Sequence, residues 1–225
     1  MRVAALVLAA SFAATAAVAQ DADRSVGDGG IKVDGWKGRV DRRPMSQGKT
    51  VADSRFNAAP GGGFRLSVGP AGNFWNPANV ASGDYDVTAT FEEHKLASSH
   101  PHSYGLFIGG ADLESDTETL LYCIVYGDGT FSVKTFHGEN VTTLVNREAS
   151  DALHKANDDW ESTNEIGWWV RGGTASCVVN GTEVKSLTNS QVVAADKLKS
   201  TDGIYGLRVS HNLELTVTGF TSSKP

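Results

Sequence analysis

Most apolar stretches of the chain alternate with polar residues at a period of two, and they are bounded by Gly, Asn, Asp or Pro. This is the pattern of half-buried strands joined by turns. Helical signals are weak and fall only at residues 150–158 and 191–199. Many short strands with little helix predict an all-β, two-sheet sandwich. The predicted strands span residues 63–68, 84–92, 103–108, 120–126, 130–136, 165–171, 174–179, 204–209 and 213–220.

The turn at residues 127–129 decides which side chains of its hairpin face inward. A two-residue loop pairs Tyr126 with Phe131, whereas a three-residue loop with a bulge at Gly129 pairs Val125 with Phe131. The two registers put opposite faces inward. We favour the three-residue loop because it separates apolar from polar side chains. It places Leu121, Cys123, Val125, Phe131 and Val133 inward and Tyr122, Tyr126, Ser132 and Lys134 outward.

The same alternation applies to the later strands at residues 165–171 and 174–179. Ile166, Trp168 and Val170 face inward with Ala175, Cys177 and Val179. Trp169 and Arg171 then face outward. An outward surface that carries Tyr, Trp, Lys and Arg is unusual, and it is the first indication of a binding face.

The first 19 residues have the pattern of a secretory signal peptide. A basic residue at position 2 precedes an Ala-rich apolar run, and Ala-Val-Ala stands before Gln20. The polar, Gly-rich residues 20–30 predict a flexible leader, and residues 31–225 predict one sandwich domain. We therefore expect an exported protein, periplasmic or extracellular, without a membrane span and monomeric. The formal net charge of −6 argues against nucleic acid as a partner.

The chain has two cysteines, Cys123 and Cys177. An even number in an exported protein permits a disulfide. Both lie in apolar runs, where a buried free thiol behaves as a small apolar side chain. The sequence leaves a Cys123–Cys177 bridge and two free thiols as open alternatives.

Three segments carry a resemblance to a known superfamily. They are SYGLFIGGADLESDTETLLYCIVYGDGTFSVKTFHGE, NEIGWWVRGGTASCVVNGTEV and GIYGLRVSHNLELTVTGF. Residues 63–220 resemble the concanavalin A-like lectin/glucanase superfamily, and more closely the exported bacterial domains related to laminin G-like modules and to the 3-keto-disaccharide hydrolase domain. The shared features are turns and core positions, so the resemblance implies a jelly-roll sandwich and suggests glycans as ligands.

Glu114, Asp116 and Glu118 match the Glu-x-Asp-x-Glu spacing that laminarinase-type glucanases of this superfamily use for catalysis. Retaining chemistry needs two carboxyl groups about 5 Å apart. Here the intervening residues are Ser115 and Thr117, where the family has aliphatic residues that anchor a strand. We therefore interpret residues 113–118 as a solvated loop without a catalytic role. A calcium site using Asp112, Glu114 and Asp116 is an alternative, because loop carboxylates suit a hard cation.

His100 and His102 lie two residues apart in a predicted loop and offer two zinc ligands. No cysteine or third histidine lies within five residues of them in the sequence, and a structural zinc site needs four ligands. We interpret them as loop residues that form hydrogen bonds. No cofactor is expected apart from the candidate structural Ca²⁺.

The outward aromatic residues are the strongest functional signal. Sugars stack their apolar C–H faces on flat rings, while polar side chains bind the hydroxyl groups. In the resembling jelly rolls, oligosaccharides commonly lie on the concave sheet. The predicted ligand site comprises Tyr122, Tyr126, Ser132, Lys134, Trp169, Arg171, Trp75 and Asn76; the alternative is that these are packing residues.

These patterns predict a module that binds a glycan or another cell-envelope component without catalysis. A glycoside hydrolase or lyase acting on a modified disaccharide or glucan is the alternative from a different class. A structural or interaction module is the second alternative.

Overall fold

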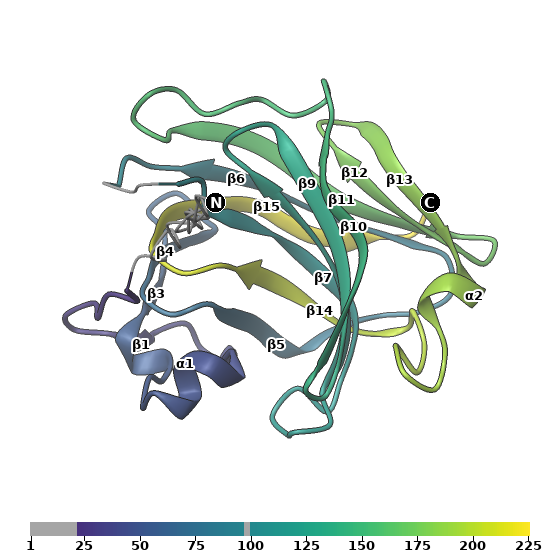
Figure 1. Cartoon of the computed structure of the whole chain (residues 1–225), viewed down its shortest axis with the longest axis horizontal. Coiled ribbons are helices and arrows are strands. Elements are labelled where there is room, and N and C mark those ends of the chain that lie inside the picture. The colour runs from purple at the N-terminus through teal and green to yellow at the C-terminus, as the bar shows by residue number, and fades with distance from the viewer. Residues whose placement is uncertain (1–21, 97–99) are drawn as a thin grey trace, which may run out of the picture.

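The computed structural model describes residues 22–96 and 100–225, and it forms two stacked β-sheets (Figure 1). The eight-stranded sheet contains, in spatial order, β1 (Gly30–Ile31), β3 (Arg55–Ala58), β4 (Phe64–Val68), β15 (Leu213–Ser223), β6 (Tyr85–Glu93), β11 (Ser162–Arg171), β12 (Thr174–Val179) and β13 (Thr182–Thr188). The seven-stranded sheet contains β10 (Asn140–Ala149), β9 (Thr130–His137), β8 (Thr119–Tyr126), β7 (Ser103–Ala111), β14 (Gly203–Val209), β5 (Gly72–Ala81) and β2 (Lys37–Val40). The predicted all-β sandwich is confirmed.

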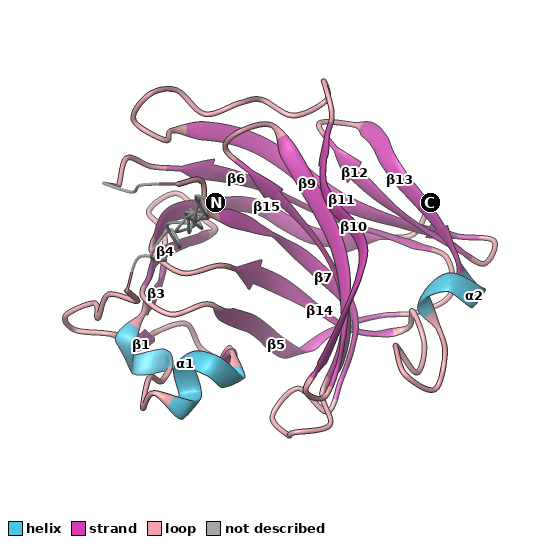
Figure 2. Cartoon of the chain, viewed as in Figure 1, coloured by secondary structure: helices cyan, strands magenta, loops and turns pink. Residues whose placement is uncertain are grey.

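Helix is confined to short segments between strands (Figure 2). They are α1 (Arg42–Ser46), the 3₁₀ turn η1 (Val51–Asp53) and α2 (Asn189–Val192). The weak helical signal at residues 191–199 therefore corresponds to one turn at most. The signal at residues 150–158 is wrong, because this segment forms turns that hold Leu153 in the core.

Each predicted strand is present, and each has at least one buried face. The sequence analysis missed β1, β2, β3, β5, β10 and β13. The reason is visible in β5 and β10: β5 contains a register shift opposite β14, and β10 is mostly exposed and pairs irregularly with β9. Neither strand therefore alternates cleanly between apolar and polar residues.

The turn between β8 and β9 has the predicted three-residue form. Val125 pairs with Phe131, and Gly129 has a φ of 85°, which a residue without a Cβ adopts easily. The inward set of side chains is buried between the sheets. The facing of every residue on these two strands therefore follows from this turn.

Cys123 in β8 and Cys177 in β12 form a disulfide across the two sheets, with Cα atoms 6.1 Å apart. Both side chains are fully buried in the core. Trp168 packs nearby and donates its indole N–H to the Leu106 carbonyl, 3.1 Å away on the opposite sheet. The sequence left open whether Cys123 and Cys177 form a disulfide or stay as free thiols, and the structure contains the disulfide.

A buried polar chain connects the two sheets at one end of the core. The Ser162 hydroxyl donates to Glu93 Oε2 at 3.2 Å and lies 2.8 Å from the Tyr104 hydroxyl. Burial raises the pKa of Glu93 to about 7, although the hydrogen bond from Ser162 opposes the shift. The neutral form of this carboxyl is thus favoured in the folded protein.

The described part of the N-terminal segment lies against the sandwich. The Arg24 guanidinium donates to the carbonyls of Val68 and Leu213 and pairs with Glu214 at 2.8 Å. These bonds belong to the segment that the sequence predicted as a flexible leader, residues 20–30. The predicted signal peptide, residues 1–19, lies outside the described residues. Within the described chain, no helix has the length and apolar character needed to cross a membrane.

Candidate functional site

The outer face of the seven-stranded sheet carries a second apolar cluster, separate from the core between the sheets. In Figure 1 this sheet is strongly curved, with β9 and β10 turned away from the plane of β14 and β5. Side chains alternate along a strand, so the neighbours of the core residues in β8 project to this outer face. The cluster contains Trp75, Phe107, Leu113, Leu120, Tyr122, Ile124 and Phe136.

Arg208 lies in the middle of this apolar face, on β14. Its strand neighbours are Asn73 in β5 and Gly105 in β7. The guanidinium carbon is 5.1 Å from the ring centroids of both Tyr122 and Phe136. Such a position, over aromatic rings and away from water, is one that a guanidinium tolerates better than an ammonium group.

Asp41 neutralises this buried cation. Its carboxylate accepts hydrogen bonds from both terminal nitrogens of Arg208, with Nη2 to Oδ2 at 2.6 Å. Burial disfavours the charged guanidinium, but the Asp41 carboxylate outweighs this effect, and the pKa of Arg208 is raised. Arg208 therefore stays charged, and the pair forms a fixed donor–acceptor unit on the sheet.

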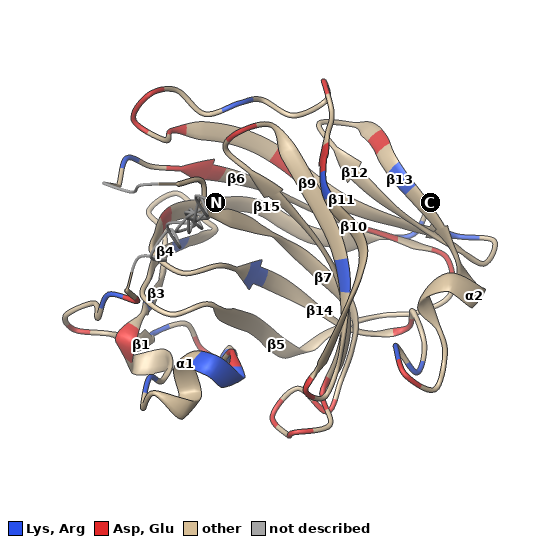
Figure 3. Cartoon of the chain, in the orientation of Figure 1, with Lys and Arg blue, Asp and Glu red and all other residues tan. Residues whose placement is uncertain are grey.

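A second charged group borders this pair. Arg39 on β2 is cross-strand neighbour to Asn73, and it lies 3.7 Å from Glu118 and 2.6 Å from Asp116. Glu118 is buried, and this burial raises the pKa of its carboxyl although Arg39 opposes the shift. Figure 3 shows the acidic loop between β7 and β8 close to the basic positions of α1, consistent with an ion pair between Arg42 and Asp116.

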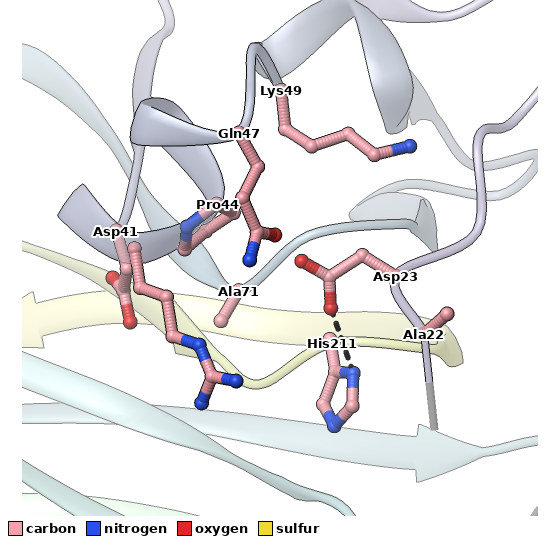
Figure 4. A pocket seen from close by; sticks show the side chains of 9 residues that line it. Ala22, Asp23, Asp41, Pro44, Gln47, Lys49, Ala71 and His211 are labelled. Carbon is pink, nitrogen blue, oxygen red and sulfur yellow. Dashed lines mark ion pairs between the residues drawn. The ribbon is translucent and has the colours of Figure 1, made fainter. Parts of the chain in front are cut away.

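A cavity of about 390 Å³ opens beside the Arg208–Asp41 pair, between α1, the N-terminal segment and the turn after β14 (Figure 4). Its polar lining comprises Asp23, Asp41, Arg43, Gln47, Lys49 and His211. Pro44 and Ala71 supply part of the apolar wall. The cavity thus offers carboxylates that accept hydrogen bonds, cationic groups that donate them, and one side-chain amide that both donates and accepts.

The structure buries two of the aromatic rings that the sequence analysis predicted as an exposed platform. Tyr122 is 3% exposed and Trp75 is 1% exposed. Gly206 separates Trp75 from Phe107 on this face, and a Cβ there would lie 2.6 Å from the Phe107 ring. The expected stacking role is therefore corrected for both: they pack into the outer cluster, and Tyr122 supports Arg208.

The other predicted residues of this hairpin lie on the outer face as expected. Tyr126 is half-buried, with the Arg147 guanidinium carbon 4.0 Å from its ring centroid. Ser132 is fully buried and accepts a hydrogen bond from the Arg147 backbone N–H at 3.0 Å. Lys134 is cross-strand neighbour to Tyr122 and is partly exposed. Of these, Lys134 and Tyr126 present polar atoms at a partly open surface.

Trp169 and Arg171 do not share this face, which corrects the prediction that they join the same sheet. Both lie on β11 of the eight-stranded sheet, so the whole thickness of the sandwich separates them from Tyr122. Arg171 pairs there with Asp86 at 2.6 Å and contacts the Trp169 ring. Asn76 is also used locally, because its side chain accepts a hydrogen bond from the Ala78 backbone N–H within β5.

The segment between β7 and β8 is a loop, as predicted, with Leu113 anchored in the outer cluster. Its carboxylates are spread over separate cations. Asp112 pairs with Lys199 at 2.6 Å, and Glu114 pairs with Lys37 at 2.6 Å. Among the described residues, Asp112, Glu114 and Asp116 are not a group with converging ligand atoms.

Sequence reasoning missed Asp41, Asn73, Arg208 and the lining of the cavity. Arg208 carried a signal, because it is a lone cation at an outward position of an otherwise apolar strand. Asp41 carried none. Its role depends on the place that the chain after β2 takes in space, 167 residues away from Arg208.

Comparisons with known proteins identify the architecture. No family model matches the chain, and no curated protein matches it in sequence. Carbohydrate-binding module CBM66 from Bacillus subtilis is similar in structure, with a TM-score of 0.55 at 10% identity over 86% of this chain and 98% of that chain. A Bacillus subtilis protein of unknown function with a galectin-like fold gives 0.53 at 12% identity over 84% and 89%. A family 7 alginate lyase in complex with substrate gives 0.51 at 12% identity over 84% and 91%.

These similarities define a class of fold. The chain has a two-sheet jelly-roll sandwich, the fold that the resemblance in the sequence implied. At 10% to 12% identity, the similarities show this fold alone. The activity has to be argued from the site.

Proposed function

We propose that this protein is an exported carbohydrate-binding module that holds a glycan or another cell-envelope ligand at the Arg208–Asp41 cavity, without catalysing its turnover. Two features support the proposal. The fold is shared with a carbohydrate-binding module, and the cavity lies beside the Arg208–Asp41 pair, where Asp41 is part of its lining.

The observation that carries the proposal is the fixed Arg208–Asp41 unit beside a polar cavity of about 390 Å³. Small-molecule sites typically have volumes of about 300 to 1,000 Å³. A sugar hydroxyl donates one hydrogen bond and accepts others, so its site needs donors and acceptors close together. Asp41 and Gln47 supply acceptors, while Arg43 and Lys49 supply donors.

The buried aromatic rings contribute indirectly. Tyr122 and Phe136 pack under the guanidinium of Arg208 and exclude water from it. A polar unit held in a site of low dielectric makes stronger hydrogen bonds to a ligand than the same unit in water. The binding residues proposed from the structure are thus Asp41, Arg43 and Gln47, supported by Arg208, rather than an exposed ring platform.

The test is a panel of soluble and insoluble polysaccharides, scored for retention of the protein and for released sugar. For any polysaccharide retained, we expect Arg43→Ala and Gln47→Ala each to weaken retention about 10-fold, the value of one charge-assisted or well-placed hydrogen bond. Arg171→Ala, on the opposite sheet, is the matched control and should bind as the parent does. Equal binding by all three variants would place the ligand elsewhere.

A hydrolase or lyase is the second candidate, and one observation favours it. Glu118 is a buried carboxyl with a raised pKa beside Arg39, the kind of group that can serve as a general acid. If the panel releases sugar, and Glu118→Gln abolishes the release while retention persists, the enzyme replaces the binding module as the conclusion. If no sugar is released by either protein, Glu118 has a structural role next to Arg39.

A further inference from the structure

Three histidines from distant parts of the sequence meet at the end of the sandwich where β7 begins and β14 ends. His100 and His102 precede β7, and His211 lies in the turn between β14 and β15. Ser103 and Ser210 join the two segments, since the Ser210 N–H donates to the Ser103 carbonyl at 2.7 Å. The third histidine that the sequence lacked near His100 and His102 is therefore supplied by the tertiary structure.

The imidazole rings converge on one point. One ligand nitrogen from each ring lies within 4.8 Å of the others. The ring centroids of His102 are 4.5 Å from His100 and 4.6 Å from His211. His102 and His211 are buried, at 5% and 7% exposure, whereas His100 is partly exposed. Buried imidazoles in this arrangement are pre-positioned by the fold rather than gathered on the surface.

Asp23 lies next to one of these rings. Its carboxylate lies 2.9 Å from Nδ1 of His211, and the other ring nitrogen points away from Asp23 (Figure 4). Histidines that bind metals commonly donate their second N–H to a carboxylate, which fixes the tautomer and makes the ligating nitrogen more basic. The ion-pair distance places the Asp23 carboxylate where it can accept a hydrogen bond from Nδ1 of His211 when the other ring nitrogen binds a metal ion.

We propose that His100, His102 and His211 bind one divalent transition-metal ion of the zinc class, with Asp23 as the residue that positions His211. Imidazole suits such ions, whereas Ca²⁺ and Mg²⁺ require oxygen ligands. Tetrahedral bonds of about 2.0 to 2.1 Å place ligand nitrogens about 3.3 Å apart. Closing the group from 4.8 Å or less thus needs side-chain shifts of no more than about 1.5 Å.

Three protein ligands leave a position of the ion for water or for a bound molecule. Asp23 and His211 also line the cavity of about 390 Å³, so the proposed metal site borders the proposed glycan cavity. A closed structural site would need a fourth protein ligand. Among residues 22–96 and 100–225, these three histidines are the only group of three or more His, Cys, Asp or Glu with converging ligand atoms.

The test uses the purified protein after treatment with a chelator and removal of the chelator. Zn²⁺ is titrated by calorimetry, and bound metal is counted by elemental analysis. We expect about one equivalent, and at a concentration 100-fold above Kd a rise in Tm of about 5 to 10 °C. Ca²⁺ and Mg²⁺ should give no shift. Both cysteines are in the disulfide, so no thiol competes for the ion.

The variants separate this site from adventitious binding. His100→Ala removes the partly exposed ligand and should abolish stoichiometric binding with little effect on the Tm of the metal-free protein. Asp23→Asn should weaken binding 10- to 100-fold while one equivalent still binds at high Zn²⁺. The control is His154→Ala, an exposed histidine bonded to the Thr163 carbonyl elsewhere.

Three results would overturn the proposal: less than a tenth of an equivalent bound, binding unchanged in His100→Ala, or an equal loss of binding in His154→Ala. The outcome is independent of glycan retention, because the titration contains the metal alone. A variant that fails to fold is recognised by its thermal melt in the absence of metal. Titration of the unaltered protein with Co²⁺ gives a second readout, because a tetrahedral Co²⁺ complex absorbs visible light.

Discussion

Removal of the Asp41 carboxylate measures the cost of leaving the Arg208 guanidinium buried without its partner. The Arg208 side chain is 9% exposed and makes two charge-assisted hydrogen bonds to Asp41. Breaking a buried ion pair from one side costs about 3 to 5 kcal/mol, because the remaining charge stays desolvated. We therefore expect Asp41→Ala to lower the free energy of unfolding by about that amount.

The assay is thermal and urea unfolding of matched variants. For a chain of this size, a loss of about 3 to 5 kcal/mol lowers Tm by roughly 6 to 20 °C. Asp86→Ala is the control, because Asp86 accepts hydrogen bonds from Arg171 Nη2 at 2.7 and 2.6 Å, at a surface where the Arg171 side chain is 45% exposed. An exposed pair contributes about 0 to 1 kcal/mol. The Asp41→Ala, Arg208→Met double variant removes both charges and should be more stable than Asp41→Ala alone.

The comparison can refute the reasoning. If Asp41→Ala costs no more than Asp86→Ala, the Arg208 guanidinium is solvated in the folded protein, and the buried donor–acceptor unit at the proposed site does not exist. If the double variant is as unstable as the sum of the two single variants, the charges are not coupled, and the cost comes from packing against Tyr122.

Three further predictions address the core and the two outer faces. Folding raises the pKa of Glu93 from 4.5 to about 7, so the folded protein binds this proton more tightly than the unfolded chain does. The free energy of unfolding should therefore fall by about 3 kcal/mol as pH rises from about 4 to 8, and thermal melts of Glu93→Gln across the same pH range should not show this decrease. Tyr122→Ala should cost about 3 to 5 kcal/mol and Trp169→Ala much less, since only Tyr122 is buried; equal losses in urea unfolding would contradict the assigned exposures. Reduction of the Cys123–Cys177 disulfide should lower stability by about 2 to 5 kcal/mol, and thiol labelling of the unreduced native protein should be absent; prompt labelling would show that the bridge does not form.

Local pattern was sufficient for much of the fold. Strand alternation placed the strands that have one buried face, and the Gly127-Asp128-Gly129 turn determined the register of its hairpin and hence the facing of both strands. The same facing put Cys123 and Cys177 inward, which is a condition for the bridge that the structure contains. These features depend on interactions between near neighbours, so the order of residues alone specifies them.

Alternation along a strand could not show which of the two sheets that strand belongs to. Trp169 and Tyr122 both face outward on their strands, but β11 and β8 belong to different sheets. Nor does an outward position imply exposure, because the cluster on the curved sheet buries Tyr122. Both outcomes depend on which strands pair and on what packs over them, and alternation within one strand contains no information about either.

The candidate sites depend on tertiary structure even more strongly. Asp41 and Arg208 are 167 residues apart, and the histidine cluster needs His211 beside two residues that precede β7. The first group depends on the pairing of β5 with both β2 and β14, and the second depends on the pairing of β14 with β7. The sequence by itself determined the strands that alternate clearly between apolar and polar residues, their faces and the residue types available for chemistry. Only the tertiary structure decided which of those side chains meet, because contacts between distant segments follow from the packing of the whole chain.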